Sequence, residues 1–240
     1  MQLFVSDYIH IDKTISIYDN DVLSQLRTVL RYRVGDVFYI QKPVYISDLI
    51  DGNMKIIRYQ LKITNWDKDK LDGTITWQEN LAIVYDKKTV IVSMTNKREK
   101  LELICQKLTE IGIQNIIIFP SKRSVIKQPN NNKITRINKI IKESVEQSYG
   151  VVLPTLSRKQ DLDLWPDDLV LYQWWSQLDI TSIPNFNNIW SIVIWPEWWW
   201  DKIELDLFKD HWCQFISIWK TILRAETAAI LWWWILKNLL

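Results

Sequence analysis

Beyond about residue 81 the sequence alternates short apolar runs with amphipathic stretches, and this alternation constrains the fold more than any other feature. Short continuous apolar runs predict buried strands, whereas apolar residues spaced by three and four predict helices. The expected strands are Thr89 to Met94, Asn115 to Phe119, Leu169 to Gln173, Ile189 to Ile194 and Phe215 to Ile218. The expected helices are Lys97 to Ile111, Lys133 to Gln147, Asp201 to Asp210 and Ala225 to Leu236. This order predicts an α/β domain with a mostly parallel sheet and helices on both faces.

The first 80 residues follow a different pattern, in which short strands are separated by turns that contain glycine. Strands are expected at Asp36 to Gln41, Lys55 to Asn65 and Thr74 to Trp77, and one helix at Asp21 to Leu30. Such a pattern is typical of a small β-barrel or sandwich. The chain is therefore interpreted as two domains, residues 1–80 and residues 81–240.

Composition excludes several classes of protein. Apolar residues make up 48% and charged residues 24%, which is typical of folded globular chains. The longest apolar run, Ala228 to Leu236, has nine residues, whereas a membrane-spanning helix needs about 20. Cys105 and Cys213 are too few for a disulfide framework or a cysteine-rich zinc site. Acidic residues near the start argue against a signal peptide, so we expect a cytoplasmic protein with no membrane segment and no metal.

Positive charge is concentrated in the middle third of the chain. Residues 81–160 hold 15 Lys and Arg against 6 Asp and Glu, whereas residues 161–240 hold 5 against 11. A basic concentration of this kind indicates a surface that meets phosphates. Solvated helix faces are the alternative reading, and the charge pattern alone leaves both open.

Polar residues gather where the predicted strands of the second domain end. The turn at residues 121–124 follows a buried strand with two cations and two hydroxyls, and residues 146–148 close a helix that could present a polar group to the same edge. Arg224 and Glu226 lie at the start of the last helix. No glycine-rich nucleotide motif is present, and the two histidines lie 201 residues apart, which disfavours metal hydrolysis and serine-histidine catalysis.

Taken in order, these segments resemble the RsmE-type 16S ribosomal RNA uridine-N3 methyltransferases of the SPOUT superfamily. Residues 26–36 (LRTVLRYRVGD) are similar to the family's V-L-R-x-x-x-G-D segment, and residues 97–112 to its K-x-x-K/R-x-E helix that ends in E-L-G. Residues 121–124 resemble its S-E-R-S turn with Lys122 in place of Glu, and residues 143–147 its A-x-E-Q helix end. Residues 194–199 (IWPEWW) align with I-G-P-E-G-G, and residues 218–228 (IWKTILRAETA) with L-G-x-x-I-L-R-x-E-T-A.

The resemblance implies an amino-terminal PUA-like β-barrel that binds RNA, followed by a SPOUT domain with a deep trefoil knot. It also implies a homodimer that uses S-adenosylmethionine to methylate N3 of a uridine in 16S rRNA of the small ribosomal subunit. The cofactor would be held by the two glycine-rich loops of the family. The residues at those positions are Ile194, Trp195, Pro196, Glu197, Trp198, Trp199, Ile218, Trp219, Ile222, Leu223 and Arg224.

The same resemblance implies which residues take part in catalysis and which bind RNA. Arg224 and Arg123 would orient the base and stabilise negative charge as N3 loses its proton, while Glu226 would fix Arg224 at the helix start. Exposed cations would bind RNA phosphates. These RNA-binding candidates are Arg27, Arg31, Arg33, Lys97, Arg98, Lys122 and Lys127.

Tryptophan and glycine counts are both abnormal, with 15 Trp and 5 Gly, although average usage would give about 17 glycines. Tryptophan stands at positions 195, 198, 199 and 219, where the family has glycine. A source organism that reads UGA codons as glycine would account for both counts, if the chain was translated with UGA as tryptophan. Two alternatives remain: a non-catalytic RNA-binding relic whose pocket is plugged by real tryptophans, or a methyltransferase for another RNA position such as a ribose 2′-OH.

Overall fold

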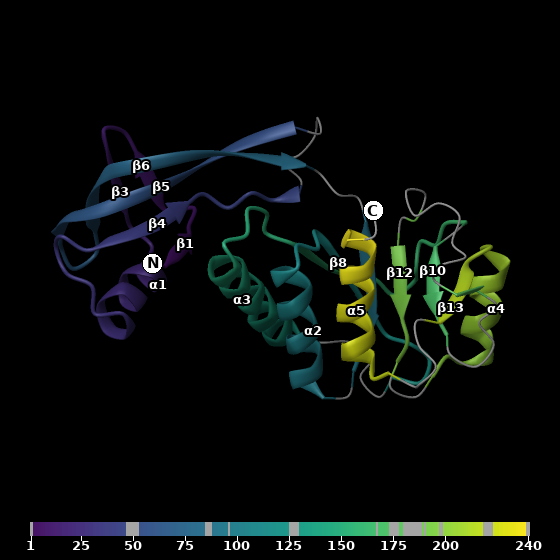
Figure 1. Ribbon diagram of the computed structural model, residues 1–240. Helices are drawn as coiled ribbons and strands as arrows, with labels where there is room; N and C mark the ends of the chain where they lie inside the picture. The colour runs from purple at the N-terminus through teal and green to yellow at the C-terminus, as the bar shows by residue number, and fades with distance from the viewer. Residues whose placement is uncertain are drawn as a thin grey trace. The chain divides into compact units, whose positions relative to one another are not determined.

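A computed structural model describes residues 2–46, 53–84, 88–95, 97–124, 130–166, 168–172, 178–179, 189, 191–196, 199–217 and 223–238 (Figure 1). The chain divides into two compact units. The first comprises Met1–Tyr85 with Lys142–Leu153, and the second comprises Asp86–Ile141 with Pro154–Leu240. The segment Lys142–Leu153, which the sequence interpretation assigned to the second domain, packs with the first unit.

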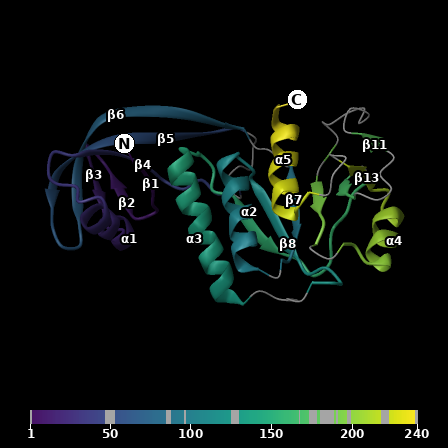
Figure 2. The same cartoon turned by 60° about the horizontal axis from the view of Figure 1, so that its bottom comes forward.

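The first unit is built on a six-stranded sheet in the order β1-β4-β5-β6-β3-β2. β1 and β4 pair in parallel, whereas the other neighbours pair antiparallel. Figure 2 shows β5 and β6 as a long, curved pair of strands. Two register shifts between them, at Gln60/Leu61 and Ile63/Asn65, bend the pair as β-bulges do. The strands are β1 (Leu3–Val5), β2 (Ile9–Ile11), β3 (Thr14–Ile17), β4 (Val37–Gln41), β5 (Asn53–Trp66) and β6 (Leu71–Val84).

Alternating side chains give this sheet a buried face. Phe38 and Ile40 of β4 and Leu61 and Ile63 of β5 all lie in one apolar core. The expected helix at residues 21–30 is α1 (Asn20–Ser24), which continues directly into a π-helical stretch at Gln25–Val29. The Asp19 carboxylate starts it by accepting the N–H groups of residues 21 and 22. The structure thus shows a curled, mostly antiparallel sheet where the sequence predicted a small β-barrel or sandwich.

The second unit is built on a seven-stranded sheet in the order β11-β13-β10-β12-β7-β8-β9. All of its neighbouring strands are parallel, which confirms the predicted parallel sheet. β9 and β11 were not predicted, because both are short and β9 has little buried surface. The strands are β7 (Thr89–Ser93), β8 (Asn115–Phe119), β9 (Thr155–Arg158), β10 (Leu169–Leu171), β11 (Leu178–Asp179), β12 (Ser191–Ile194) and β13 (Gln214–Ser217).

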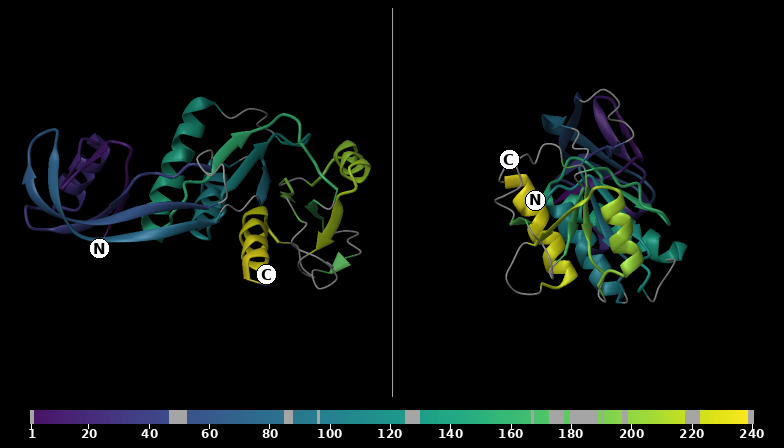
Figure 3. Two further views of the ribbon diagram at one scale, coloured as in Figure 1. Left: turned by 90° about the horizontal axis from the view of Figure 1, so that it is seen from above. Right: turned by 90° about the vertical axis from the view of Figure 1, so that its right-hand side faces the viewer.

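Helices lie on both faces of the parallel sheet, as predicted. α5 packs against α2 and β12, and α4 lies on the opposite face from α5 (Figure 3, right). Leu101, Ile104 and Leu108 of α2 are spaced by three and four residues, so they lie on one face of the helix, and all three are buried. No described helix is long and apolar enough to cross a membrane. The helices are α2 (Arg98–Glu110), α3 (Asn131–Ser148), α4 (Lys202–Asp210) and α5 (Ala225–Asn238).

Candidate active site at the carboxyl edge of the parallel sheet

The order of the parallel strands marks one crevice as the place for a ligand. The chain moves outward through β7, β8 and β9, and then returns to build β10, β11, β12 and β13 on the other side of β7, with β12 next to β7. The direction therefore reverses between β7 and β12. In open α/β sheets, ligands bind beyond the carboxyl ends of the strands at such a reversal. The loops after β7, β8 and β12 are consequently the candidate site.

The turn after β8 is locked to the end of β7 by buried hydroxyl groups. The Ser124 Oγ donates to the Met94 carbonyl at 3.0 Å and lies 3.2 Å from the Ser121 Oγ and 3.4 Å from the Ser93 Oγ. All three serines are buried. Lys122 and Arg123, at the tip of the turn, are exposed. The turn therefore presents two cations on a fixed backbone at the expected edge.

A buried carboxylate joins this turn to the start of α4. Glu204, only 7% exposed, accepts the Lys122 N–H on Oε1 and the Asp201 N–H on Oε2, each at 2.8 Å. The Asp201 carboxylate caps α4 and lies 3.8 Å from the Arg123 Nε. Sequence reasoning missed Glu204, although an N-cap Asp followed three residues later by Glu is a capping-box signal. Glu204 therefore fixes the backbone that carries Arg123.

The loop after β12 contains four tryptophans, and the three that the structure describes lie in different environments. The rings of Trp195 and Trp199 stack with centroids 5.9 Å apart, and Trp199 has a φ of 65°. Trp200 is buried between Phe119 and Phe208, and its indole N–H donates to the Leu171 carbonyl at 3.1 Å. Of the other predicted cofactor residues here, Ile194 and Pro196 are buried at the end of β12, and Glu197 and Trp198 lie outside the described residues.

The start of α5 carries the other predicted residues of this edge. Arg224 is exposed and Leu223 half-buried, while Ile218, Trp219 and Ile222 lie outside the described residues. Glu226 is half-buried, and its Oε2 is buried without a hydrogen-bond partner among the described residues. The expected contact between Glu226 and Arg224 therefore stays a prediction.

The predicted RNA-binding residues divide between the units. Arg27, Arg31 and Arg33 are exposed in the first unit. The Arg27 guanidinium is already engaged, since it lies over the Trp66 ring at 5.3 Å and donates to the Asp67 carbonyl at 2.9 Å. In the second unit, Lys97, Arg98 and Lys122 are exposed, and the Arg98 Nε lies 3.1 Å from the Glu102 Oε1. Lys127 lies outside the described residues.

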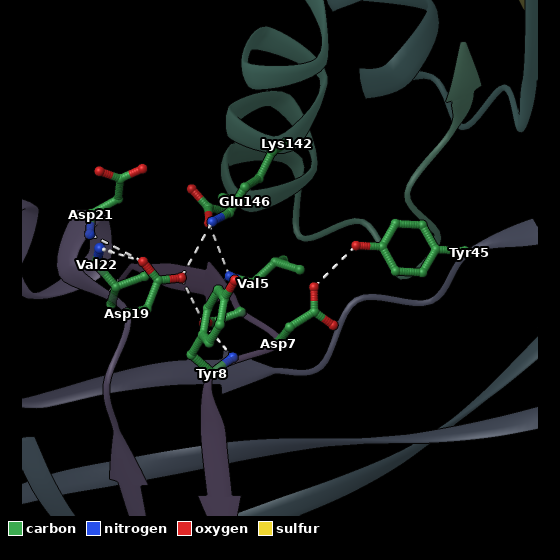
Figure 4. A network of polar contacts seen from close by, with 10 residues as sticks. Val5, Asp7, Tyr8, Asp19, Asp21, Val22, Tyr45, Lys142 and Glu146 are labelled. Carbon is green, nitrogen blue, oxygen red and sulfur yellow. Dashed lines mark hydrogen bonds and ion pairs between the residues drawn. The ribbon is translucent and has the colours of Figure 1, made fainter. Parts of the chain in front are cut away.

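Glu146 does not serve the sheet edge, contrary to the expectation for residues 146–148. Its Oε1 accepts the Val5 N–H at 2.9 Å within the first unit (Figure 4). Burial raises the pKa of Glu146 to about 7, against the opposing effect of the Val5 hydrogen bond. Nearby, the Lys142 Nζ lies 3.7 Å from the Asp19 carboxylate. The sequence could not show this contact because the partners are 141 residues apart.

Comparison with known proteins defines the class. A family model described as an RNA methyltransferase domain matches residues 85–237, and the chain belongs to this family. Among curated relatives, the chain is 31% identical over 184 residues to the ribosomal RNA small subunit methyltransferase E of Bacillus subtilis, covering 68% of this chain and 70% of that protein. It is 27% identical over 228 residues to ribosomal RNA small subunit methyltransferase E 2 of Borreliella burgdorferi, covering 90% and 88%. The resemblance drawn from the motifs is thereby confirmed.

Solved structures show the same fold. The ribosomal RNA small subunit methyltransferase E of Neisseria gonorrhoeae, bound to S-adenosyl methionine, superposes with a TM-score of 0.76 at 19% identity and covers 100% of this chain and 98% of that chain. A putative methyltransferase of Legionella pneumophila, also in complex with this cofactor, superposes with a TM-score of 0.75 at 17% identity, covering 99% and 96%. The fold found here is therefore one on which proteins bind this cofactor.

Proposed function

We propose that the protein transfers the methyl group of S-adenosylmethionine to N3 of a uridine in 16S rRNA of the small ribosomal subunit. The observation that carries the proposal is that the serine-locked turn and the loop after β12 lie at the carboxyl edge of a parallel sheet of this family, and that Arg224 follows β13 of the same sheet. The names of the curated relatives support the rRNA substrate.

Backbone groups of residues 194–199 and 218–224 would hold the cofactor. The backbone of the first loop fits this role, because the φ of 65° at Trp199 is a conformation that glycine adopts at no steric cost. The indole rings fit less well, since those of Trp195 and Trp199 fill space at the end of β12. We therefore propose that positions 195, 198, 199 and 219 are glycine in the protein made by its own cells.

S-adenosylmethionine supplies an electrophilic methyl group, and the chain's residues position the base against it. Arg123, held by the turn that Glu204 fixes, would bind a phosphate or the uracil edge. Arg224 would stabilise the negative charge that develops as N3 loses its proton. Positioning of this kind supplies much of the barrier reduction for a bimolecular transfer.

The remaining features follow the family. We propose that the second unit contains a trefoil knot, that the first is a PUA-like RNA-binding domain, and that the protein works as a cytoplasmic homodimer. Its exposed cations, two sets in a dimer, would bind rRNA phosphates. The stacked rings of Trp195 and Trp199 favour a second candidate, a non-catalytic RNA-binding relic.

The test is methylation of small ribosomal subunits by the version with glycine at 195, 198, 199 and 219, with the product nucleotide mapped. In that background, Arg224→Ala should nearly abolish transfer while cofactor affinity stays within a few fold, because its interaction strengthens only in the transition state. Arg136→Ala is the matched control, since Arg136 is an exposed arginine of the same unit that pairs with Glu102. Loss of cofactor binding with unchanged turnover at saturation would contradict the role of Arg224. An active enzyme that methylates a ribose or another base would contradict the substrate.

A further inference from the structure

Aromatic side chains form a row across the face of the first sheet that points away from its core. In the register of the sheet, Tyr39 of β4 lies opposite Gln60 of β5, which lies opposite Trp77 of β6. The flanking residues Phe38, Ile40, Tyr59 and Leu61 belong to the apolar core. Because successive side chains of a strand alternate between faces, Tyr39, Gln60 and Trp77 lie on the other face.

A third ring joins this row from the end of α3. The Tyr39 centroid lies 6.0 Å from that of Trp77 and 6.0 Å from that of Tyr149, with interplanar angles of 73° and 76°. We call Tyr39, Trp77 and Tyr149 the aromatic row. Trp77 is 45% exposed and Tyr149 is 38% exposed, so two rings of the row present surface to solvent.

A buried cation, Arg58, holds the Tyr149 end of the row in place. Arg58 is 7% exposed; its Nε donates to Gln41 and its Nη2 donates to the carbonyl groups of Tyr149 and Gly150. Its guanidinium lies 5.7 Å from the centre of the Tyr149 ring. Rings that are already fixed lose little conformational entropy when a ligand stacks on them.

Polar and cationic side chains lie next to the row, together with the half-buried Val37 of β4 and with Glu79 of β6, which lies opposite Arg58. The Gln60 Nε2 donates to the Tyr39 hydroxyl at 3.3 Å, and the Thr76 Oγ1 donates to the Gln60 Oε1 at 2.8 Å. Exposed Lys62 lies on the same face two residues along β5, which is a distance of about 7 Å. The loop with Arg31 and Arg33 comes directly before β4. Flat rings next to hydrogen-bonding groups and cations suit a nucleic acid strand better than an apolar peptide.

We propose that the aromatic row stacks unpaired bases of the RNA substrate, while Lys62 contacts a neighbouring phosphate. This inference rests on the proposed function, because it takes RNA as the partner. It assigns a specific RNA contact to the first unit, most of which lies outside the region matched by the family model. The two tyrosines are the residues to test, because they do not depend on how tryptophan codons are read.

The experiment measures binding of a labelled single-stranded oligouridine by fluorescence polarisation at several salt concentrations. Tyr39→Leu and Tyr149→Leu should each weaken binding by about tenfold, because base stacking on an aromatic ring is lost, and should leave the salt slope unchanged. Lys62→Ala should instead make the dependence of log affinity on log salt concentration less steep, by about the amount that one phosphate contact contributes. Tyr39→Phe keeps the ring and should bind nearly as wild type. The matched control is Tyr8→Leu. Tyr8 is an exposed tyrosine that comes just before β2, the strand at the far edge of the sheet from β4.

Unchanged affinity in both leucine variants would overturn the proposal, as would failure of the wild-type protein to bind the oligonucleotide or an equal loss in Tyr8→Leu. If a leucine variant unfolds, the wild-type protein is mixed with an oligonucleotide that contains 2-aminopurine. Stacking quenches this base, so unchanged fluorescence on binding would overturn the proposal too. Methylation of small ribosomal subunits and calorimetric cofactor binding are measured in parallel. If the protein methylates the subunits but the leucine variants bind the oligonucleotide as wild type does, only the role of the aromatic row is refuted. If the bases stack on the row but no methylation is detected, only the proposed function is refuted.

Discussion

Two helices of the second unit end with the same hydrogen bonds but with different residues. At the end of α2, the N–H groups of Gly112 and Ile113 donate to residues 109 and 108, and Gly112 has a φ of 87°. At the end of α4, the N–H groups of Trp212 and Cys213 donate to residues 209 and 208, and Trp212 has a φ of 60°. This is the Schellman motif, whose left-handed position is usually glycine. The α4 end therefore has the backbone of a glycine cap with a tryptophan side chain.

A third helix end shows what a non-glycine residue needs at this position. Tyr149 follows α3 with a φ of 55°, but Arg58 binds its carbonyl group and its ring packs against Tyr39. Trp212 is 79% exposed, and its side chain makes no aromatic contact or hydrogen bond among the described residues. A left-handed residue costs about 1–2 kcal/mol, and only Tyr149 has contacts that offset this cost.

Tryptophans of the loop after β12 and of α5 also differ in how well their surroundings fit an indole ring. Trp200 is buried, has its indole N–H bonded, and fills the core against Phe119 and Phe208. Trp199 adopts a positive φ, which tryptophan rarely does, and its ring stacks on that of Trp195. Trp232 is buried, and its indole N–H has no partner among the described residues. Trp200 therefore suits its site, whereas the positive φ of Trp199 and the unbonded indole N–H of Trp232 are unfavourable for tryptophan.

The largest expected effect is on cofactor binding. The chain with glycine at 195, 198, 199 and 219 should fold and bind S-adenosylmethionine, whereas the chain with four tryptophans should fold poorly or fail to bind it. Overpacking costs about 1–3 kcal/mol per site, and a bulky residue at positive φ adds about 1–3 kcal/mol. Calorimetric titration of both proteins measures the difference, and equal affinities would contradict the account of the loops.

The stability of the protein should depend on pH through Glu146, near the end of α3. The folded pKa of Glu146, about 7, lies above its ordinary value of 4.5 because the side chain is buried. The folded state therefore binds this proton more tightly than the unfolded state, and its stability should fall as the pH rises from about 4.5 to about 7. Glu146→Gln should remove this dependence and raise the free energy of unfolding by about 2–3 kcal/mol near pH 8. Urea unfolding at several pH values measures it, with the exposed Glu143→Gln as control; identical pH profiles for wild type and Glu146→Gln would refute it.

A substitution at the start of α4 should have a smaller effect, because the Asp201 cap of this helix stays in place. Glu204→Gln removes one of two acceptors, which serve the Lys122 and Asp201 N–H groups. We expect a loss of about 1–2 kcal/mol in stability, and about a tenfold lower kcat with little change in the KM for the cofactor. Glu99→Gln is the control, since Glu99 is an exposed glutamate in the first turn of α2. A change in cofactor KM alone would show that Glu204 does not act through Arg123.

The smallest expected effect lies at the two compared helix ends. Trp212→Gly should stabilise the protein by about 1 kcal/mol, and Gly112→Ala should destabilise it by about the same amount. Trp165→Gly, at an exposed tryptophan without a positive φ, should not stabilise, since an added glycine favours the unfolded chain. Thermal unfolding of the three variants measures the effects. A loss of stability in Trp212→Gly would break the comparison.

Local patterns in the sequence predict much of this fold, and contacts between distant residues account for what they miss. Strands such as Asn115–Phe119 and helices such as α2 are recognisable because their apolar spacing repeats within a few residues. The contact from Glu146 to Val5 and the row of Tyr39, Gln60 and Trp77 depend on packing and strand register. Within the candidate site, Arg123 and Arg224 were identified by motif, whereas the role of Glu204 required the fold to bring the turn after β8 to α4.

The most direct test is peptide mass spectrometry of the protein isolated from its own cells. The account predicts glycine at positions 199 and 212, where the backbone is left-handed, and tryptophan at position 200, which is buried and hydrogen-bonded. Tryptophan at both 199 and 212 would contradict it, and would favour the relic over the methyltransferase.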